Sequence, residues 1–158
     1  MGLSAELCKN HGMVDRTASD EHYVLDLCDD ALGMSSCRQA TFDWLRGDPS
    51  PLRPLGTKLP VDGFWSDLKL VVEFQEEQHS KPSPFFDRRQ TVSGVGRGEQ
   101  RRLYDERKRL LIPEHGLKLV VIEKSAFIVK SKRIRRDPTR DIAVVRAHLG
   151  NAQPKQRL

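Results

Sequence analysis

The sequence predicts a single α/β domain in which helices flank a mixed β-sheet. The chain has 158 residues, which is enough for one domain with a sizeable core. Its apolar fraction of 37% and charged fraction of 31% are typical of a polar globular protein. Helical apolar patterns also occur together with short, strand-sized apolar runs. We expect the domain to span residues 19–150, with its α/β core at 57–150.

The first part of the chain is predicted to form a flexible arm at residues 1–18 and then a two-helix extension at 19–47. Ser19 and the two acids after it are typical of a helix start, and Gly33 is typical of a helix end. Apolar side chains recur between them at helical spacing: Val24, Leu27, Cys28 and Ala31. The second helix is expected at residues 35–46.

Two strands follow a proline-rich loop at residues 48–56. The strand candidates are residues 59–65 and 68–75, and only Ser66 and Asp67 separate them. Two such runs with a two-residue gap predict a β-hairpin.

The second half of the chain begins with an irregular, glycine- and proline-containing stretch at residues 80–98. A charged helix is predicted at 99–112, a buried strand at 117–122 and a last helix at 138–150, before a frayed tail at 151–158. The residues expected to face inward from the charged helix are Leu103, Tyr104, Leu110 and Leu111.

Positive charge is concentrated in one region. The chain has a net charge of +5, and residues 97–140 contain 14 bases against 6 acids. Such a segment is typical of a protein that binds nucleic acid, although a helix face with internal ion pairs is the alternative. Besides the basic run at 130–136, the expected DNA contacts are Arg88, Arg89, Arg97, Arg101, Arg102 and Lys108.

The predicted hairpin brings two acids together. With a two-residue turn, one face carries only Gly63 and apolar residues, and Asp62 and Glu73 become diagonal neighbours on the other face. Two carboxylates at this spacing can hold one hard cation such as Mg²⁺, which suits phosphodiester hydrolysis. The alternative is that both acids are ordinary polar residues of a solvated face.

The same residues carry a family resemblance. Residues 59–79 (LPVDGFWSDLKLVVEFQEEQH) and residues 116–122 (GLKLVVI) resemble the core of the PD-(D/E)XK nuclease superfamily, in the branch of the very-short-patch-repair and homing endonucleases. The resemblance covers residues 59–123. It implies a restriction-endonuclease-like mixed sheet and a DNA endonuclease that depends on Mg²⁺ or Mn²⁺.

The resemblance also implies site residues. Asp62 and Glu73 would bind the metal, and Gln75, Gln78 and His79 would complete the catalytic set. Two departures from the family pattern stand out, because Gln75 replaces the usual Lys and Glu76 replaces a Gly. Either His79, Lys81 or Lys108 supplies the missing positive charge, or the site is impaired. Members of the superfamily often add an acid from a helix, and Glu21 and Glu99 are the candidates here. The alternative is that each acid only stabilises the N-terminus of its helix.

Other interpretations remain open at this stage. A catalytically silent nuclease-fold module that binds nucleic acid or a protein partner is one, and a protein–protein adaptor is another. A zinc site at Cys8, His11, Cys28 and Cys37 is a third, although the spacing matches no familiar zinc module. We expect a cytoplasmic protein without a membrane partner, and a homodimer stays open.

Overall fold

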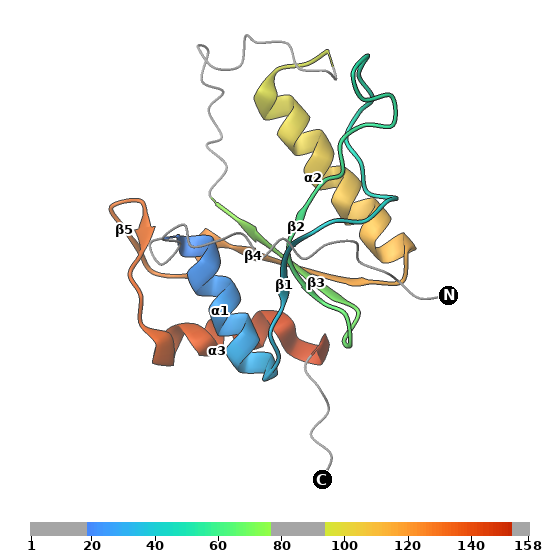
Figure 1. Ribbon diagram of the computed structural model, residues 1–158. Coiled ribbons are helices and arrows are strands. Elements are labelled where there is room, and N and C mark those ends of the chain that lie inside the picture. The colour runs from blue at the N-terminus through green and yellow to red at the C-terminus, as the bar shows by residue number, and fades with distance from the viewer. Residues whose placement is uncertain (1–18, 77–93, 153–158) are drawn as a thin grey trace.

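The structure of the protein is a computed structural model that describes residues 19–76 and 94–152. A four-stranded sheet lies between helices on both of its faces (Figure 1). In chain order the main elements are α1 (Asp20–Leu32), β1 (Cys37–Ala40), β2 (Val61–Trp65), β3 (Leu70–Gln75), α2 (Arg97–Glu114), β4 (Lys118–Glu123) and α3 (Pro138–Leu149). The short elements are η1 (Lys124–Ala126), β5 (Val129–Lys130), β6 (Arg133–Ile134) and η2 (Gly150–Ala152). The predicted α/β class with a mixed sheet is confirmed.

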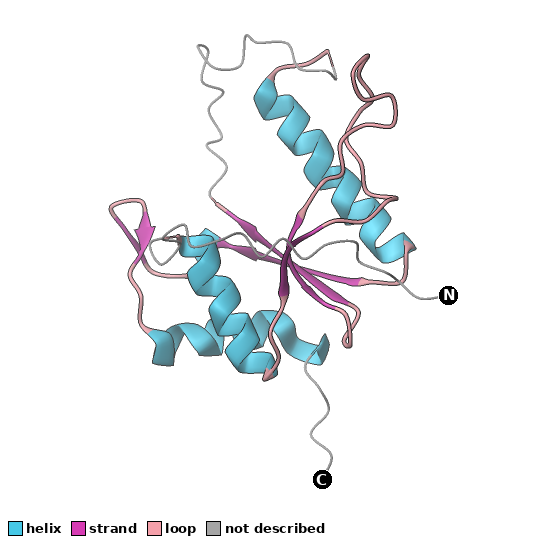
Figure 2. Ribbon diagram, in the orientation of Figure 1, coloured by secondary structure: helices cyan, strands magenta, loops and turns pink. Residues whose placement is uncertain are grey.

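The sheet has the order β1-β2-β3-β4. The pairs β1–β2 and β2–β3 are antiparallel, whereas β4 is parallel to β3. A parallel pair needs a long crossover connection, and α2 lies in that connection. Helix α2 therefore covers one face of the sheet, while α1 and α3 cover the other (Figure 2). Buried residues form two clusters, one with α1 and α3 and one with α2.

Helix α1 begins and ends where the sequence predicts. The Ser19 side chain accepts a hydrogen bond from the His22 N–H, and Gly33 ends the helix with φ of 65°. Three members of the predicted apolar stripe, Val24, Leu27 and Cys28, lie in the core. The helix from Pro138 to Gly150 is also confirmed as α3. Predictions for the arm, the tail beyond residue 152 and most of the 80–98 loop lie outside the described residues.

The second N-terminal helix is a wrong prediction, because this segment contains strand β1. Its main chain pairs with β2, with Cys37 opposite Phe64 and Ala40 opposite Val61. The apolar residues Ala40 and Phe42 are both buried and stand two positions apart, which is strand spacing. Pairing with β2 therefore overrides the local preference for a helix.

The hairpin is confirmed, but its predicted register is wrong by two residues. Trp65 pairs with Leu70, so four residues rather than two connect the strands. Lys69 closes this turn with φ of 49°, and its N–H donates to the Ser66 carbonyl. A shift of two residues keeps every side chain on its predicted face. It changes every cross-strand pair, and it places Asp62 directly opposite Glu73.

The predicted burial of the second half of the chain needs two corrections. In α2, Ile112 is buried, whereas Leu110 is 61% exposed. Strand β4 is buried mainly at Ile122, because β4 is an edge strand of the described sheet.

The basic segment after β4 forms η1 and the β5–β6 hairpin rather than irregular chain.

A buried ion pair anchors this basic segment to α1. Lys124 Nζ lies 2.9 Å from Asp20 Oδ2, and both residues are less than 10% exposed. The same Asp20 oxygen accepts a hydrogen bond from the Ile134 N–H at 3.2 Å. Residues 130–136, which we expected to contact DNA, therefore lie beside α1, on the opposite side of the sheet from α2.

Candidate active site

The two predicted metal ligands meet on the face of the sheet that α2 covers. The Asp62 N–H donates to Glu73 Oε1 at 3.1 Å, and the Phe74 N–H donates to Asp62 Oδ2 at 2.8 Å. Each carboxylate is thus held by the main chain next to the other acid. Glu73 is 8% exposed and Asp62 is half-buried. We call these two residues the acid pair.

Lys108 of α2 completes the acid pair with a positive charge. Its Nζ donates to Glu73 Oε2 at 2.8 Å, and the exposed fractions of the two side chains are 14% and 11%. Lys108 was predicted both as a DNA contact and as one of three candidates to replace the missing Lys at position 75. The structure places it at the acid pair.

The electrostatics of the pair follow from burial and from the closeness of two like charges. Burial, and secondly the charge of Asp62, raise the pKa of Glu73 to about 7, although Lys108 opposes this. Burial also raises the pKa of Asp62, while the Phe74 N–H and Lys108 act in the opposite direction. Ionisation of both carboxylates is therefore unfavourable, and an additional cation would offset the repulsion between their negative charges.

Gln39 is a site residue that the sequence analysis missed. Its Nε2 donates to Asp62 Oδ1 at 3.4 Å and to Glu21 Oε1 at 3.3 Å, so it links α1 to the acid pair. Gln39 has φ of 54°, a backbone conformation that is uncommon for a residue other than glycine and is often found at functional sites. No sequence signal identified it, because the residues around it were predicted as a helix.

The two helical acids that the resemblance suggested behave differently. Glu21 approaches the acid pair through Gln39. Glu99 instead forms an ion pair with Arg102 at 2.6 Å on the exposed side of α2. Asp105, which was not predicted, lines a small cavity together with Glu73 and Lys108.

Gln75 ends β3 on the same face of the sheet as Glu73. Its Oε1 accepts a hydrogen bond from Arg109 Nη2 at 3.3 Å. The other predicted catalytic residues, Gln78 and His79, lie outside the described residues. The same holds for three basic candidates: Lys81, Arg88 and Arg89.

The remaining predicted DNA contacts lie on the N-terminal half of α2. Arg97, Arg101 and Arg102 are all exposed. Arg101 precedes Lys108 by seven residues, which places both on one side of the helix about 10 Å apart along its axis. A line of exposed cations therefore leads along α2 toward the acid pair.

The acid pair fits a hard divalent cation. Each of its four oxygens accepts one hydrogen bond, from Phe74, Gln39, Asp62 or Lys108, and a carboxylate oxygen keeps a further lone pair for a metal. In the described ranges, no group of three or more His, Cys, Asp or Glu side chains is placed to hold a metal ion. Two carboxylates still suit Mg²⁺, which commonly keeps several waters and takes substrate phosphate as ligand.

The zinc alternative gains no support from Cys28. This residue is fully buried in the core, and burial raises the pKa of its thiol to about 12, which opposes formation of the thiolate that zinc requires. Two of the other proposed ligands, Cys8 and His11, lie outside the described residues.

Comparison of the chain with protein-family models, with curated proteins and with solved structures gives no match. The functional interpretation therefore rests on the geometry of the side chains. Over the described part of the chain, none of the helices combines the length and the apolar character needed to cross a membrane.

Proposed function

We propose that the protein is a metal-dependent endonuclease with a restriction-endonuclease-like fold that hydrolyses DNA phosphodiester bonds. One observation carries the proposal. Asp62 and Glu73 lie opposite each other on neighbouring strands, and Lys108 Nζ lies 2.8 Å from Glu73. Two acids and one lysine are the residue types of the PD-(D/E)XK pattern, although here the acids lie on the sheet and the lysine lies on α2.

Lys108 accounts for the main departure from the family pattern. The usual lysine stands two residues after the second acid, where this chain has Gln75. Lys108 supplies an ammonium group next to the same acid, but from α2 instead of β3. Its role would be to offset the charge of Glu73 and to donate a hydrogen bond to the attacking water or to a phosphate oxygen.

The chain's own residues account for the remaining parts of the reaction. Asp62 and Glu73 would hold Mg²⁺ or Mn²⁺. When bound, the ion would polarise a phosphoryl oxygen and lower the pKa of a bound water. Gln39 and the Phe74 N–H keep Asp62 in place. The exposed arginines of α2 would hold the neighbouring phosphates and so position the scissile bond without reading sequence.

A catalytically silent binding module is the second candidate, and one observation favours it. All four oxygens of the acid pair already accept hydrogen bonds from the protein, so both side chains are held in place without a metal. Such a module would keep the cationic surface of α2 and lack the cleavage activity.

Cleavage of supercoiled plasmid DNA separates the two candidates. We expect nicked and linear products with Mg²⁺ or Mn²⁺, none with EDTA, and a loss of at least about a hundredfold in rate for Asp62→Asn, Glu73→Gln and Lys108→Met. The matched control is Asp67→Asn, which changes an exposed carboxylate in the β2–β3 turn and should cleave like the wild type.

DNA binding is measured separately, by fluorescence anisotropy in EDTA. Wild-type protein that binds DNA with a steep salt dependence, but cleaves none under any metal condition, would establish the silent module. The expected slope of log K against log salt is about −0.9 per neutralised phosphate. Cleavage that survives in both acid variants would overturn the nuclease proposal.

A further inference from the structure

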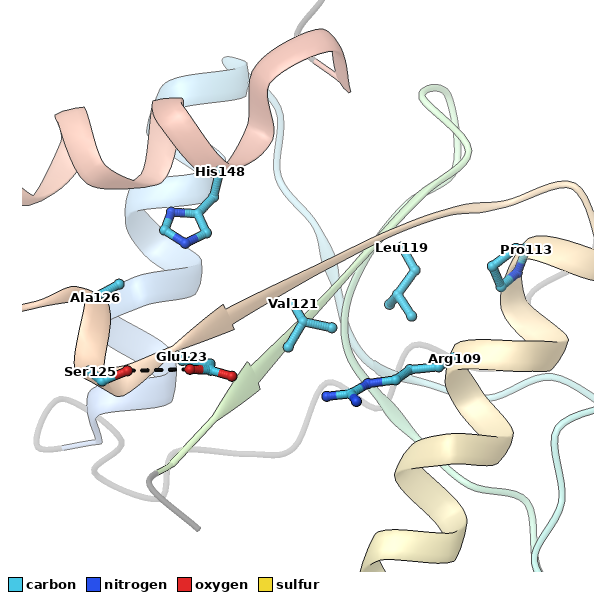
Figure 3. Close-up of a pocket in the computed structure, with 8 residues that line it drawn as sticks. All are labelled: Arg109, Pro113, Leu119, Val121, Glu123, Ser125, Ala126 and His148. Atoms are coloured by element: carbon cyan, nitrogen blue, oxygen red, sulfur yellow. Dashed lines mark hydrogen bonds between the residues drawn. The ribbon is translucent and has the colours of Figure 1, made fainter.

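A hollow of about 510 Å³ lies along β4, between α2 and α3. This volume falls in the range of small-molecule binding sites, roughly 300–1,000 Å³. Arg109 of α2 and His148 of α3 approach the strand from opposite sides, and Val121 lies between them (Figure 3). Beyond the end of β4, Ser125 of η1 lies next to Glu123 (Figure 3).

The hollow is adjacent to the acid pair. Arg109, Leu119 and Val121 line the hollow, and the same three residues line the small cavity that Glu73 and Lys108 also border. A nucleic acid strand with one phosphate at the acid pair would therefore present a neighbouring nucleotide to the hollow.

The chemistry of the hollow changes along its length. At the end near the acid pair, the Arg109 guanidinium suits a phosphate. Leu119 and Val121 offer aliphatic surface for the face of a base. At the other end are hydrogen-bond acceptors. In the tautomer whose Nδ1–H donates to the Val144 carbonyl, Nε2 of His148 is an acceptor, and the Glu123 carboxylate accepts from Ser125 Oγ at 3.3 Å.

We infer that this hollow binds one unpaired nucleotide of the substrate strand, next to the phosphate at the acid pair, and that it prefers cytosine to thymine. An acceptor-rich end matches the N4 amino group of cytosine, whereas thymine presents the O4 acceptor at that position. A base that is stacked and paired inside a duplex is not free to reach these side chains, so the nucleotide must be unpaired or flipped out of the duplex. The inference rests on the proposed nuclease function.

The test uses DNA duplexes that contain a single unpaired cytosine, a single unpaired thymine or no unpaired base. Both binding in EDTA and cleavage with Mn²⁺ are measured. We expect the wild type to prefer the cytosine duplex over the thymine duplex by about tenfold. Glu123→Gln, a mild change at an exposed residue, should bring this ratio close to one. The matched control Glu114→Gln, at an exposed site on α2, should leave the ratio unchanged.

A second pair of variants tests the volume of the hollow. Val121→Trp fills it and should weaken binding of the cytosine duplex by about tenfold. Leu110→Trp introduces the same side chain at a 61% exposed position outside the lining and should have no effect. Circular dichroism would check that both variants fold.

The outcomes distinguish failure of this inference from failure of the nuclease proposal. Tighter binding of the cytosine duplex without any cleavage supports nucleotide binding in the hollow and rules out nuclease activity. Equal cleavage of all three duplexes by the wild type, with the same rates in Val121→Trp, overturns nucleotide binding in the hollow and supports the nuclease proposal. A dimer detected by light scattering in the wild type, and lost in Val121→Trp, would make the hollow an interface between copies and also overturn the inference.

Discussion

Neutralising Glu73 should change how the stability of the protein depends on pH. The pKa of Glu73 rises from an ordinary value of 4.5 to about 7, because its side chain is buried beside Asp62. The folded protein therefore binds this proton more tightly than the unfolded chain does. Between about pH 4.5 and about pH 7 the unfolded chain loses the proton first, so raising the pH over this window favours unfolding.

The magnitude follows from the size of this change. One pKa unit corresponds to about 1.4 kcal/mol, so the charged form of Glu73 costs the folded protein about 3 kcal/mol above pH 7. Below pH 4.5 the acid is neutral in both states and the cost disappears. Glu73→Gln removes the titrating group and with it the pH dependence that this group causes.

The assay is urea unfolding in EDTA from about pH 4 to about pH 8, for the wild type and Glu73→Gln. The free energy of unfolding of the wild type should fall by about 3 kcal/mol relative to the variant over this range. The control Glu114→Gln, at an exposed carboxylate, should follow the wild type. A constant difference between wild type and Glu73→Gln at every pH would refute the reasoning, as would a difference of opposite sign.

Three further predictions concern a buried ion pair, a close backbone approach and the binding of a metal ion. Lys124→Met should lower the free energy of unfolding by about 3–5 kcal/mol, because it leaves Asp20 buried without its cation, and thermal unfolding would measure this. Gly56→Ala should lower the free energy of unfolding by more than about 1 kcal/mol, since an added Cβ would lie 2.1 Å from the Gly47 carbonyl oxygen. At Gly33 an added Cβ has no neighbour within 4 Å, so Gly33→Ala should cost only the strain of the positive φ, about 1 kcal/mol. Millimolar Mg²⁺ should raise the melting temperature of the wild type above about pH 7 and not that of Glu73→Gln.

Each of these has a result that contradicts it. Lys124→Met as stable as the wild type would show that the ion pair contributes nothing net. Equal losses for the two glycine variants would show that the close approach at Gly56 relaxes at no cost. A Mg²⁺ effect of equal size in both proteins would place the ion elsewhere.

Local sequence chemistry was sufficient for much of the fold. Helix α1 was predictable because Ser19 and Gly33 act within a few residues of their hydrogen-bond partners. The faces of the β2–β3 hairpin were predictable because side chains alternate with period two, so even a register error of two residues kept Asp62 and Glu73 on one face.

Pairing across the chain determined what local patterns could not. Residues 37–40 form a strand only because β2 offers them a partner, and this pairing brings Gln39 to Asp62 across a separation of 23 residues. The four-residue turn depends on the positive φ of Lys69, which Ser66 and Asp67 gave no reason to expect.

The cation beside the acid pair shows the same division. The sequence left three candidates to replace the lysine missing at position 75, or an impaired site. Of these three, Lys108 lies in the described residues, and the crossover of α2 between the parallel strands β3 and β4 brings it to Glu73, 35 positions away in the chain. Composition and periodicity report on neighbours along the chain, whereas a site assembled from two strands and a crossover helix depends on distances through space.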